Sequence, residues 1–243
     1  RRLARDIDGF VAVSTYFART MQERLDIEDQ RMHVVHMGID LKDYVPSPSR
    51  PPVPTVGFLS QMCPERGLAT LVDAFVLLKG RHGLRETRLR ISGGRSGADE
   101  PFIKQLQDKL QAAGVLHDVD FLEAFDRDAK LDFLRSLSVL CVPEQGPVAC
   151  GLYALEALAM GVPVVEPAIG CFPEMIEMTG GGVLYTPNST ETLAEVLASL
   201  LLDDEAAKKL GAQGRDGVHR AFDVEQTAQK MVETCERIAQ QTK

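Results

Sequence analysis

Cysteine is scarce in this sequence, tryptophan is absent, and no apolar run reaches the ~20 residues that a membrane-spanning helix needs. The 5 cysteines are an odd number without a Cys-x-x-Cys pair, so they indicate free thiols in a reducing compartment and neither a disulfide framework nor a zinc site. The 5 histidines form no pair at metal-ligand spacing, and we expect no metal. No signal-peptide pattern is present. These absences predict a cytoplasmic protein without a membrane span.

Positive charge is also in deficit, with 27 Lys and Arg against 35 Asp and Glu and a formal net charge of −8. Because nucleic acid is bound through clustered Lys and Arg side chains, this balance argues against a nucleic-acid partner. Several chemical motifs are missing too. There is no G-x-G-x-x-G after the first strand, no P-loop, no G-x-S-x-G and no H-E-x-x-H. The first of these absences argues against a nicotinamide or flavin enzyme.

What is present is the composition of a globular protein: 243 residues, 44% hydrophobic and 26% charged. The length suits one large domain, or one domain with a fragment of another. The chain opens with Arg1-Arg2-Leu3 and no methionine. We therefore interpret it as the C-terminal part of a longer protein that begins inside a preceding domain.

A proline-rich segment divides the predicted elements. Before it, an apolar run at Phe10–Ser14, a helical stretch at Thr15–Leu25 and a second run at His33–Met37 indicate strand, helix and strand. Residues 46–52 are rich in proline, which neither a helix interior nor a central strand accommodates. We predict an extended interdomain linker there.

After the linker, short apolar runs alternate with helix-length segments, which indicates a parallel sheet covered by helices on both faces. We predict the α/β class, with a doubly wound, six-stranded parallel sheet over residues 53–187 and helices after it. Asn188 and Glu191 have the spacing of a capping box at a helix start, and so do Asp223 and Gln226. The expected strands are Thr55–Leu59, Leu89–Ser92, Val119–Leu122, Val139–Val142, Val162–Val165 and Val183–Tyr185, and the expected helices are Leu68–Lys79, Pro101–Ala113, Ala129–Leu137, Leu152–Met160 and Pro173–Met178.

Ligands of doubly wound sheets bind outside the carboxyl ends of the strands, where helix N-termini carry partial positive charge. After the first strand of this sheet, Arg66 precedes Gly67 near a helix start, and a guanidinium beside free backbone N–H groups suits a phosphate. The alternative is an ordinary surface arginine at a loop–helix junction. The small-residue loop at residues 92–97 either admits a ligand close to the backbone or only turns the chain.

A helix that begins at Gly151 presents its first amides to the same edge. Glu156 lies in this otherwise apolar helix. An isolated carboxylate there needs a partner, because burying an unpaired charge is costly. A protein donor and a pair of ligand hydroxyls both fit, and the residues alone leave the two open.

The longest continuous signature is Gly151–Val165 (GLYALEALAMGVPVV), which continues in Phe172-Pro173-Glu174 and in Gly180–Leu184. It resembles the C-terminal, donor-binding half of retaining GT-B glycosyltransferases of the family-4 type. The similarity runs along the whole chain. Residues 11–14 and 34–40 resemble the end of that family's acceptor-side domain, and residues 56–59, 66–68 and 71–75 resemble the start of its donor domain.

The resemblance implies two Rossmann-like domains around a cleft. Residues 1–45 would end the N-terminal acceptor-side domain, 46–52 would be the linker, 53–222 would bind the nucleotide-sugar donor, and 223–243 would form a C-terminal helix. In the family this helix packs back on the N-terminal domain, although its apolar stripe equally suits packing on its own domain. The implied reaction transfers a sugar from a nucleotide diphosphate sugar to an acceptor hydroxyl with retention, without metal or other cofactor. A carbohydrate or lipid-linked acceptor would be held by the N-terminal domain.

The resemblance also assigns donor contacts. It places Arg66 on the donor pyrophosphate, where the family usually has lysine, together with the amides of Gly151 and Leu152. Glu156 would hold the ribose hydroxyls, and the strand end at residues 122–125 would face the base. The implied donor-binding set is Gly57, Gln61, Arg66, Gly93, Leu122, Ala124, Gly151, Leu152, Tyr153 and Glu156.

Two positions depart from the family pattern. The family's paired glutamates lie eight residues apart, and eight residues before Glu156 stands Val148, whose side chain cannot accept a hydrogen bond. Gln61 stands where an arginine usually precedes the Lys-Gly pair. No catalytic residue is therefore assigned, and Glu144, in the same loop as Val148, is the candidate substitute. The alternative functions are a catalytically impaired nucleotide-sugar-binding or scaffold protein and a sugar-nucleotide epimerase of GT-B fold.

Overall fold

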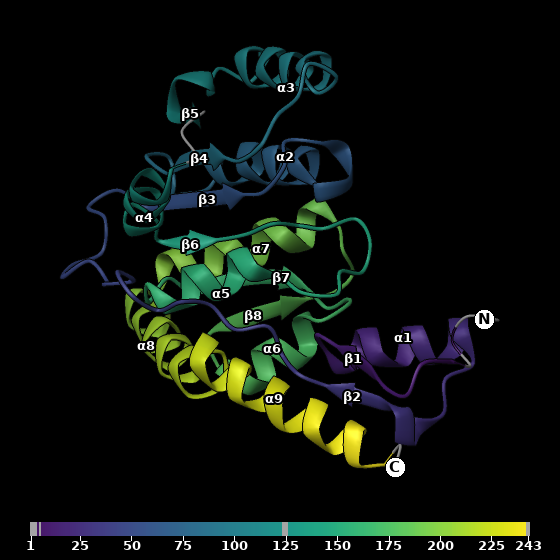
Figure 1. Cartoon of the computed structure of the whole chain (residues 1–243). Helices are drawn as coiled ribbons and strands as arrows, with labels where there is room; N and C mark the ends of the chain where they lie inside the picture. The colour runs from purple at the N-terminus through teal and green to yellow at the C-terminus, as the bar shows by residue number, and fades with distance from the viewer. Residues whose placement is uncertain (1–3, 5, 123–125, 242–243) are drawn as a thin grey trace.

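The computed structural model describes residue 4, residues 6–122 and residues 126–241. A two-stranded sheet lies near the N-terminus and a six-stranded sheet forms the body of the molecule (Figure 1). The strand order in the larger sheet is β5-β4-β3-β6-β7-β8, and its neighbours pair in parallel. The predicted α/β class and six-stranded parallel sheet are confirmed. The strands are β3 (Thr55–Leu59), β4 (Arg88–Ser92), β5 (Val119–Leu122), β6 (Val139–Leu140), β7 (Val164–Pro167) and β8 (Gly182–Tyr185).

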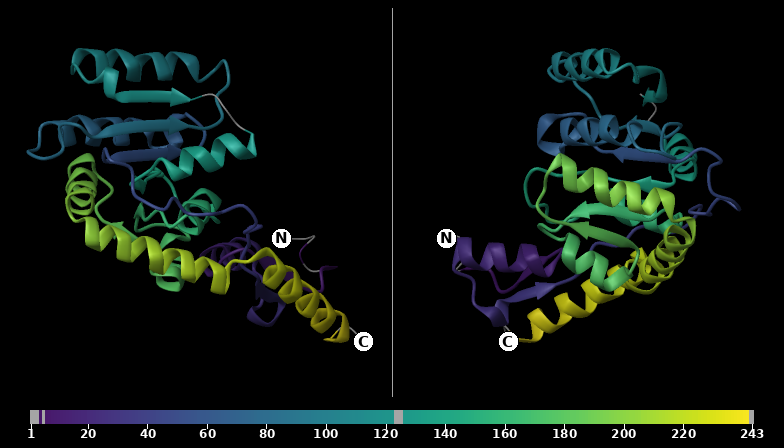
Figure 2. Two further views of the ribbon diagram at one scale, coloured as in Figure 1. Left: turned by 90° about the vertical axis from the view of Figure 1, so that its left-hand side faces the viewer. Right: turned by 180° about the vertical axis from the view of Figure 1, so that it is seen from behind.

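Helices cover both faces of this sheet (Figure 2), as a doubly wound fold requires. On one face, α2, α3 and α7 enclose a buried cluster that includes Phe58 and Phe75. On the other, α4, α5, α6 and α8 enclose a second cluster that includes Leu155 and Phe172. These helices are α2 (Leu68–Lys79), α3 (Glu100–Ala112), α4 (Arg127–Arg135), α5 (Leu152–Ala159), α6 (Phe172–Thr179), α7 (Thr190–Leu202) and α8 (Asp204–Ala221).

The predicted bounds differ from the structure by a few residues where a turn intervenes. β7 begins at Val164 and not at Val162. Gly161, which is left-handed with φ 72°, still turns the chain out of α5 just before this strand. The strand therefore starts two residues later than the apolar run.

The two predicted capping boxes are corrected. Asn188 does not cap α7, because its side chain accepts from the Tyr185 hydroxyl and donates to the carbonyl oxygen of Glu144. Ser189 is the N-cap and accepts from the amide of Thr192. The serine sits one residue closer to the helix, so it reaches the amides that the asparagine was expected to reach.

The second predicted capping box, at Asp223 and Gln226, is half right. Asp223 accepts from the amide of Glu225 at 2.9 Å, as a cap would. The Gln226 side chain donates to the carbonyl oxygen of His219 instead of returning to Asp223. The reciprocal half of the capping box is therefore absent between these two residues.

The first residues form a separate β–α–β unit. β1 (Phe10–Ala12) pairs in parallel with β2 (Met32–Val34), and α1 (Thr15–Leu25) connects them. Ser14 caps α1 by accepting from the amide of Phe17. These are the predicted strand, helix and strand, with both strands shorter than the apolar runs.

The last helix, α9 (Val224–Gln241), runs from the end of α8 to this N-terminal unit and lies beside β2 (Figures 1 and 2). The Thr227 hydroxyl donates to the carbonyl oxygen of His36 at 3.1 Å. Near the other end of α9, Ile238 lies so close to Gly9 that a Cβ there would be 2.6 Å from it. The C-terminal helix thus packs on the first unit of the chain.

Candidate functional site

Helix α5 begins at the carboxyl edge of the larger sheet, after the loop that follows β6. Gly151 precedes its first residue, and no side chain in the described parts of the chain caps this end. The first amides of a helix have no partner within the helix, and the helix dipole adds partial positive charge there. This end of α5 is therefore suited to an anion.

Arg66 ends a short 3-10 helix, η3 (Pro64–Arg66), at the same edge. Its Nη1 atom donates to both carboxylate oxygens of Glu144, at 2.9 and 3.1 Å. The Tyr153 hydroxyl, from the first turn of α5, donates to the same carboxylate at 3.1 Å. The Glu144 side chain is 2% exposed and that of Arg66 39%. Arg66 is thus a partly exposed cation anchored beside α5, and not an unattached surface arginine.

Electrostatics at Glu144 reflect both its burial and its partners. Burial raises the pKa of Glu144, while Arg66 and Tyr153 act to lower it. The carboxylate is therefore held by hydrogen bonds in a place that water reaches poorly. Such a pair is costly to break on one side only, because the remaining charge would stay buried.

Two glycines bring the loops after β3, β4 and β6 together. Gly67 has φ 71°, and a Cβ atom there would lie 1.8 Å from the carbonyl oxygen of Pro143. Gly93 has φ 151°, and its Cβ would lie 1.6 Å from the carbonyl oxygen of Ser60. No side chain fits at either position, so the loops pack backbone against backbone. This packing holds Arg66 next to the residues that follow β6.

Glu156, on α5, already has protein partners. Its Oε1 atom accepts from the Tyr44 hydroxyl at 3.0 Å and from the ammonium group of Lys130 on α4. The Glu156 side chain is 16% exposed. Its Oε2 atom accepts no hydrogen bond from the residues that the structure describes. The protein donor that the sequence left open is present, and one carboxylate oxygen remains for a ligand.

The structure places the other predicted donor residues unevenly. Gln61 follows β3 at the expected edge, and its side chain acts to lower the pKa of Asp99. Leu152 opens α5 and is 38% exposed. Leu122 ends β5, whereas Ala124 lies outside the described residues. Gln61 and Leu152 thus lie at the same edge of the sheet as Arg66 and Glu144.

Gly57, which the resemblance places in the donor-binding set, lies in the middle of β3 and not at the end of the strand, and it is buried. A Cβ atom there would lie 2.2 Å from a methyl carbon of Leu137. The absence of a side chain at Gly57 therefore serves the packing of β3 against the segment that precedes β6.

Val148 stands where the family resemblance leads one to expect a glutamate. Its carbonyl oxygen accepts from the amide of Cys171 at 3.0 Å, and its side chain packs against the second core cluster. Glu144, the candidate substitute, is engaged by Arg66 and Tyr153. In this conformation neither side chain supplies a free carboxylate at the expected position.

Three polar side chains of the site were not predicted: Tyr44, Lys130 and Glu166. Glu166 lies in β7, is fully buried, and has no ion-pair partner within the described ranges. Burial, and then the charge of Glu144, raise the pKa of Glu166 well above its ordinary value. Glu166 is a single carboxylate inside an apolar run of the sequence, and this pattern could have identified it as a candidate. The local sequence around Tyr44 and Lys130 gives no sign that they reach Glu156.

A search of the described residues finds no group of three His, Cys, Asp or Glu side chains that could hold a metal ion. It also finds no helix long and apolar enough to cross a membrane. The polar groups at the carboxyl edge include a guanidinium, an ammonium, tyrosine hydroxyls, backbone amides and carboxylates.

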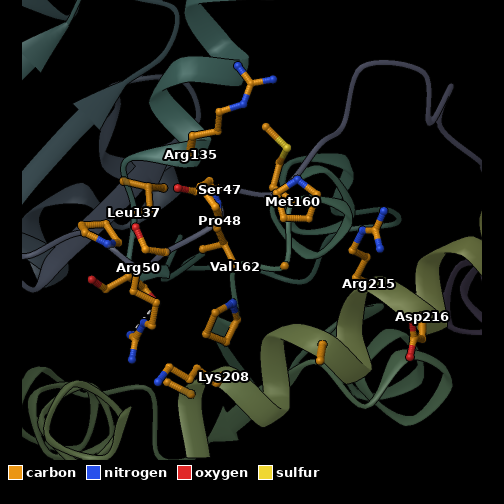
Figure 3. A pocket seen from close by; sticks show the side chains of 18 residues that line it. Ser47, Pro48, Arg50, Arg135, Leu137, Met160, Val162, Lys208, Arg215 and Asp216 are labelled. Carbon is orange, nitrogen blue, oxygen red and sulfur yellow. Dashed lines mark hydrogen bonds between the residues drawn. The ribbon is translucent and has the colours of Figure 1, made fainter. Parts of the chain in front are cut away.

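A cavity of about 380 Å³ lies at the opposite edge of the sheet, between residues 46–51, α8 and the residues that precede β6 and β7 (Figure 3). Apolar residues such as Leu137 and Val162 contribute to its lining. Its cationic side chains lie on different sides of the hollow and do not converge (Figure 3). These side chains are Arg50, Arg135, Lys208 and Arg215.

Comparison with known proteins identifies relatives of the chain. The family described as "Glycosyl transferases group 1" matches residues 45–217. An MMP alpha-(1->4)-mannosyltransferase of Mycolicibacterium hassiacum is 26% identical over 98% of the chain. A D-inositol 3-phosphate glycosyltransferase of Xylanimonas cellulosilytica is 29% identical over 93% of it. The chain covers 56% of each of these relatives, or about half their length.

Solved structures share the fold at low sequence identity. The match to sucrose-phosphate synthase of Thermosynechococcus elongatus has a TM-score of 0.81 at 22% identity. It covers 94% of this chain and 57% of the synthase chain. The match to Anabaena Alr3699/HepE in complex with UDP and glucose has a TM-score of 0.82 at 21% identity. It covers 94% of this chain and 63% of the Alr3699/HepE chain. The fold is that of GT-B glycosyltransferases.

Proposed function

The chain belongs to the group 1 glycosyl transferases, and on that premise we propose that it holds the nucleotide-sugar donor of a retaining glycosyltransferase. The observation that carries the proposal is the uncapped start of α5 with Arg66 on one side and Glu156 on the other. The reaction would transfer a sugar from a nucleotide diphosphate sugar to an acceptor hydroxyl, without an obligatory metal or other cofactor. The family match favours this transferase over the epimerase.

The diphosphate would lie at the start of α5. The amides of Gly151 and Leu152 would donate to it, with Tyr153 in the same turn, and the unbonded nitrogens of Arg66 would pair with it. Negative charge grows on the diphosphate as the sugar departs. Groups already pointed at that charge lower the barrier, because they need no reorganisation during the reaction.

The nucleoside would lie between α5 and α4. The Oε2 atom of Glu156, which accepts no hydrogen bond from the described residues, would accept one from a ribose hydroxyl, while Tyr44 and Lys130 hold the other oxygen in place. The end of β5 at Leu122 and the segment that contains Ala124 would face the base. Gln61 and Gly93 would line the approach from the neighbouring loops.

We assign the domains accordingly. Residues 1–45 would end the acceptor-side domain, 46–52 would be the linker, 53–222 would bind the donor, and 223–243 would return to the first domain. Acceptor contacts and any general base would come from the N-terminal part of the full-length protein. Alr3699/HepE, whose fold this chain shares, is known with UDP and glucose bound, which supports a nucleotide-sugar site on this fold.

A second candidate function is donor binding without turnover. Val148 presents an apolar side chain at the expected glutamate, and Glu144 is engaged elsewhere. Gln61 offers an amide in place of a charged arginine. Loss of one charge-stabilising contact costs about 10²–10³ in rate, so two losses would leave a binding or scaffold protein.

Calorimetric titration with UDP, GDP and ADP, followed by a donor-hydrolysis assay, tests the proposal. Binding with turnover supports the transferase, and binding without turnover supports the second candidate. Glu156→Gln should weaken nucleotide binding about tenfold, because a carboxylate is the stronger acceptor for a ribose hydroxyl. Glu195→Gln, on the exposed surface of α7, is the matched control and should bind as the wild type does. Failure of the wild type to bind any of the three nucleotides contradicts the proposal.

Val148→Glu separates the two candidates further. If the missing carboxylate limits turnover, this variant should hydrolyse the donor faster than the wild type by about 10²-fold. Unchanged hydrolysis in a variant that still binds donor would place the deficit elsewhere.

A further inference from the structure

Glu144 is locked from three directions. Nη1 of Arg66 donates to both of its carboxylate oxygens, the Tyr153 hydroxyl donates to Oε1, and the Asn188 amide donates to its backbone carbonyl. These partners come from η3, from α5 and from the loop after β8. The carboxylate is therefore fixed relative to the start of α5.

The contact with Glu144 uses only part of the hydrogen-bonding capacity of Arg66. A single nitrogen, Nη1, faces Glu144, and Nη2 and Nε donate to no other residue in the described ranges. The side chain remains 39% exposed. A guanidinium held by one edge presents its remaining N–H groups in a fixed direction, which suits a phosphate.

The charge of the cluster is also set by Glu144. The carboxylate places a negative charge within hydrogen-bond distance of the cation that the proposed diphosphate must use. Glu166, from the neighbouring strand, is close enough to Glu144 for the two carboxyls to affect each other, and no lysine or arginine pairs with it among the described residues. Arg66 thus pairs with Glu144 alone of these two buried carboxyls.

We propose that Glu144 is a positioning residue that orients Arg66 and sets which anions the site prefers. Its charge repels an anion bound to Arg66, and the repulsion grows with the charge of that anion. A free nucleoside diphosphate has a terminal phosphate that takes a second negative charge with a pKa near ~6, whereas the sugar ester has lost that ionisation. Glu144 therefore favours the nucleotide sugar over the nucleoside diphosphate left after transfer. This inference rests on the proposed donor site.

The consequence for the reaction cycle is faster release of the product. When the bond from the sugar to the diphosphate breaks, the electron pair stays on the diphosphate, whose charge becomes more negative by one. The product then faces Glu144 with more charge than the substrate did. The same carboxylate that orients the cation thus weakens the product complex.

The test compares Glu144→Gln, which keeps the shape and removes the charge, with Tyr153→Phe, which removes a hydrogen bond from the same carboxylate and keeps its charge. Calorimetric titrations use UDP, UDP-glucose and inorganic pyrophosphate. We expect Glu144→Gln to bind UDP and pyrophosphate about tenfold more tightly and UDP-glucose about threefold more tightly. Tyr153→Phe should leave the ratio of UDP to UDP-glucose affinity unchanged.

Pyrophosphate separates this inference from the proposed function, because it has neither ribose nor base. A gain for pyrophosphate with no binding of UDP, GDP or ADP to either protein would support the role of Glu144 and contradict the nucleotide-sugar site. No gain for pyrophosphate, or an equal gain for UDP and UDP-glucose, overturns the inference. If thermal unfolding shows that Glu144→Gln does not fold, Glu144→Ala removes the same charge. The readout is then the ratio of UDP to UDP-glucose affinity, because loss of Arg66 orientation weakens both ligands alike whereas loss of the repulsion favours UDP.

Discussion

The two edges of the six-stranded sheet differ in what they offer a ligand. The amino edge has a cavity of about 380 Å³, but two of the cations that line it, Arg50 and Lys208, are both paired with Asp204. The carboxyl edge has buried carboxylates, a partly bonded guanidinium and the uncapped start of α5. Parallel strands place helix N-termini at this second edge and helix C-termini at the first. Converging polar groups, and not the volume of a hollow, therefore locate the site.

The largest expected effect comes from the close packing at the carboxyl edge. Gly67→Ala places a Cβ 1.8 Å from the carbonyl oxygen of Pro143 at a left-handed position. We expect the free energy of unfolding to fall by about 3 kcal/mol, measured by urea denaturation. Gly94→Ala is the control, since nothing lies within 4 Å of its Cβ position. Equal stability of the two variants would show that this edge is not closely packed.

Another carboxylate at this edge, Glu174 on α6, links the larger domain to the N-terminal unit. Its oxygens accept from the amide and the hydroxyl of Thr15, and Oε1 contacts Nε2 of His36 at 2.6 Å. Burial acts to raise the pKa of Glu174, but these hydrogen bonds outweigh it and keep the pKa below the ordinary value of 4.5. The folded state therefore favours the ionised form.

Because the folded pKa is depressed, the stabilisation by Glu174 is present above pH 4.5 and is lost as the pH falls through the folded pKa. Glu174→Gln should lower the free energy of unfolding at pH 7 by about 2 kcal/mol, and the difference from the wild type should shrink in acid. Unfolding curves between neutral and acidic pH measure this. A difference that stays constant with pH would mean that the carboxylate charge is not involved.

A smaller effect is expected at Tyr44, which reaches Glu156 from the segment before the proline-rich residues 46–52. Tyr44→Phe removes the hydroxyl that holds Oε1 of Glu156 and leaves the ring in place. Nucleotide affinity should fall about threefold, and the free energy of unfolding by about 1 kcal/mol. An unchanged affinity would show that Lys130 alone orients Glu156.

The smallest effect is expected for a change at Arg215, and a large effect there would overturn the comparison of the two edges. Arg215 lines the amino-edge cavity, and its Nε atom has no hydrogen-bond partner in the described part of the chain. Arg215→Ala should leave nucleotide affinity unchanged and alter the free energy of unfolding by about 0.5 kcal/mol or less. A large loss of nucleotide binding in this variant would move the site to the amino edge.

Local patterns in the sequence predicted what depends on neighbours along the chain. The apolar runs predicted each strand of the larger sheet, because strands buried on both faces are continuously apolar. The start of α5 at Gly151 followed from the same alternation. The resemblance brought Arg66 and Glu156 to one edge, where the structure also places them.

The pairings within the site could not be predicted, because they join residues far apart in the sequence. Arg66 and Glu144 are 78 positions apart, and Tyr44 and Glu156 are 112 apart. No local pattern encodes which carboxylate meets which cation. Gly57 shows a second limit of prediction from sequence. A glycine in a strand serves either close packing or ligand approach, and the local sequence does not distinguish the two. Its contact with Leu137 depends on the tertiary fold.

The most direct test of the central claim follows the backbone amides of the ¹⁵N-labelled chain by NMR while the nucleoside diphosphate that binds most tightly is added. If the start of α5 holds the diphosphate, the amides of Gly151, Leu152 and Tyr153 will shift most, and those of residues 46–51 and 207–216 will stay in place. Largest shifts around the amino-edge cavity, with the α5 amides unmoved, would contradict the donor site described above.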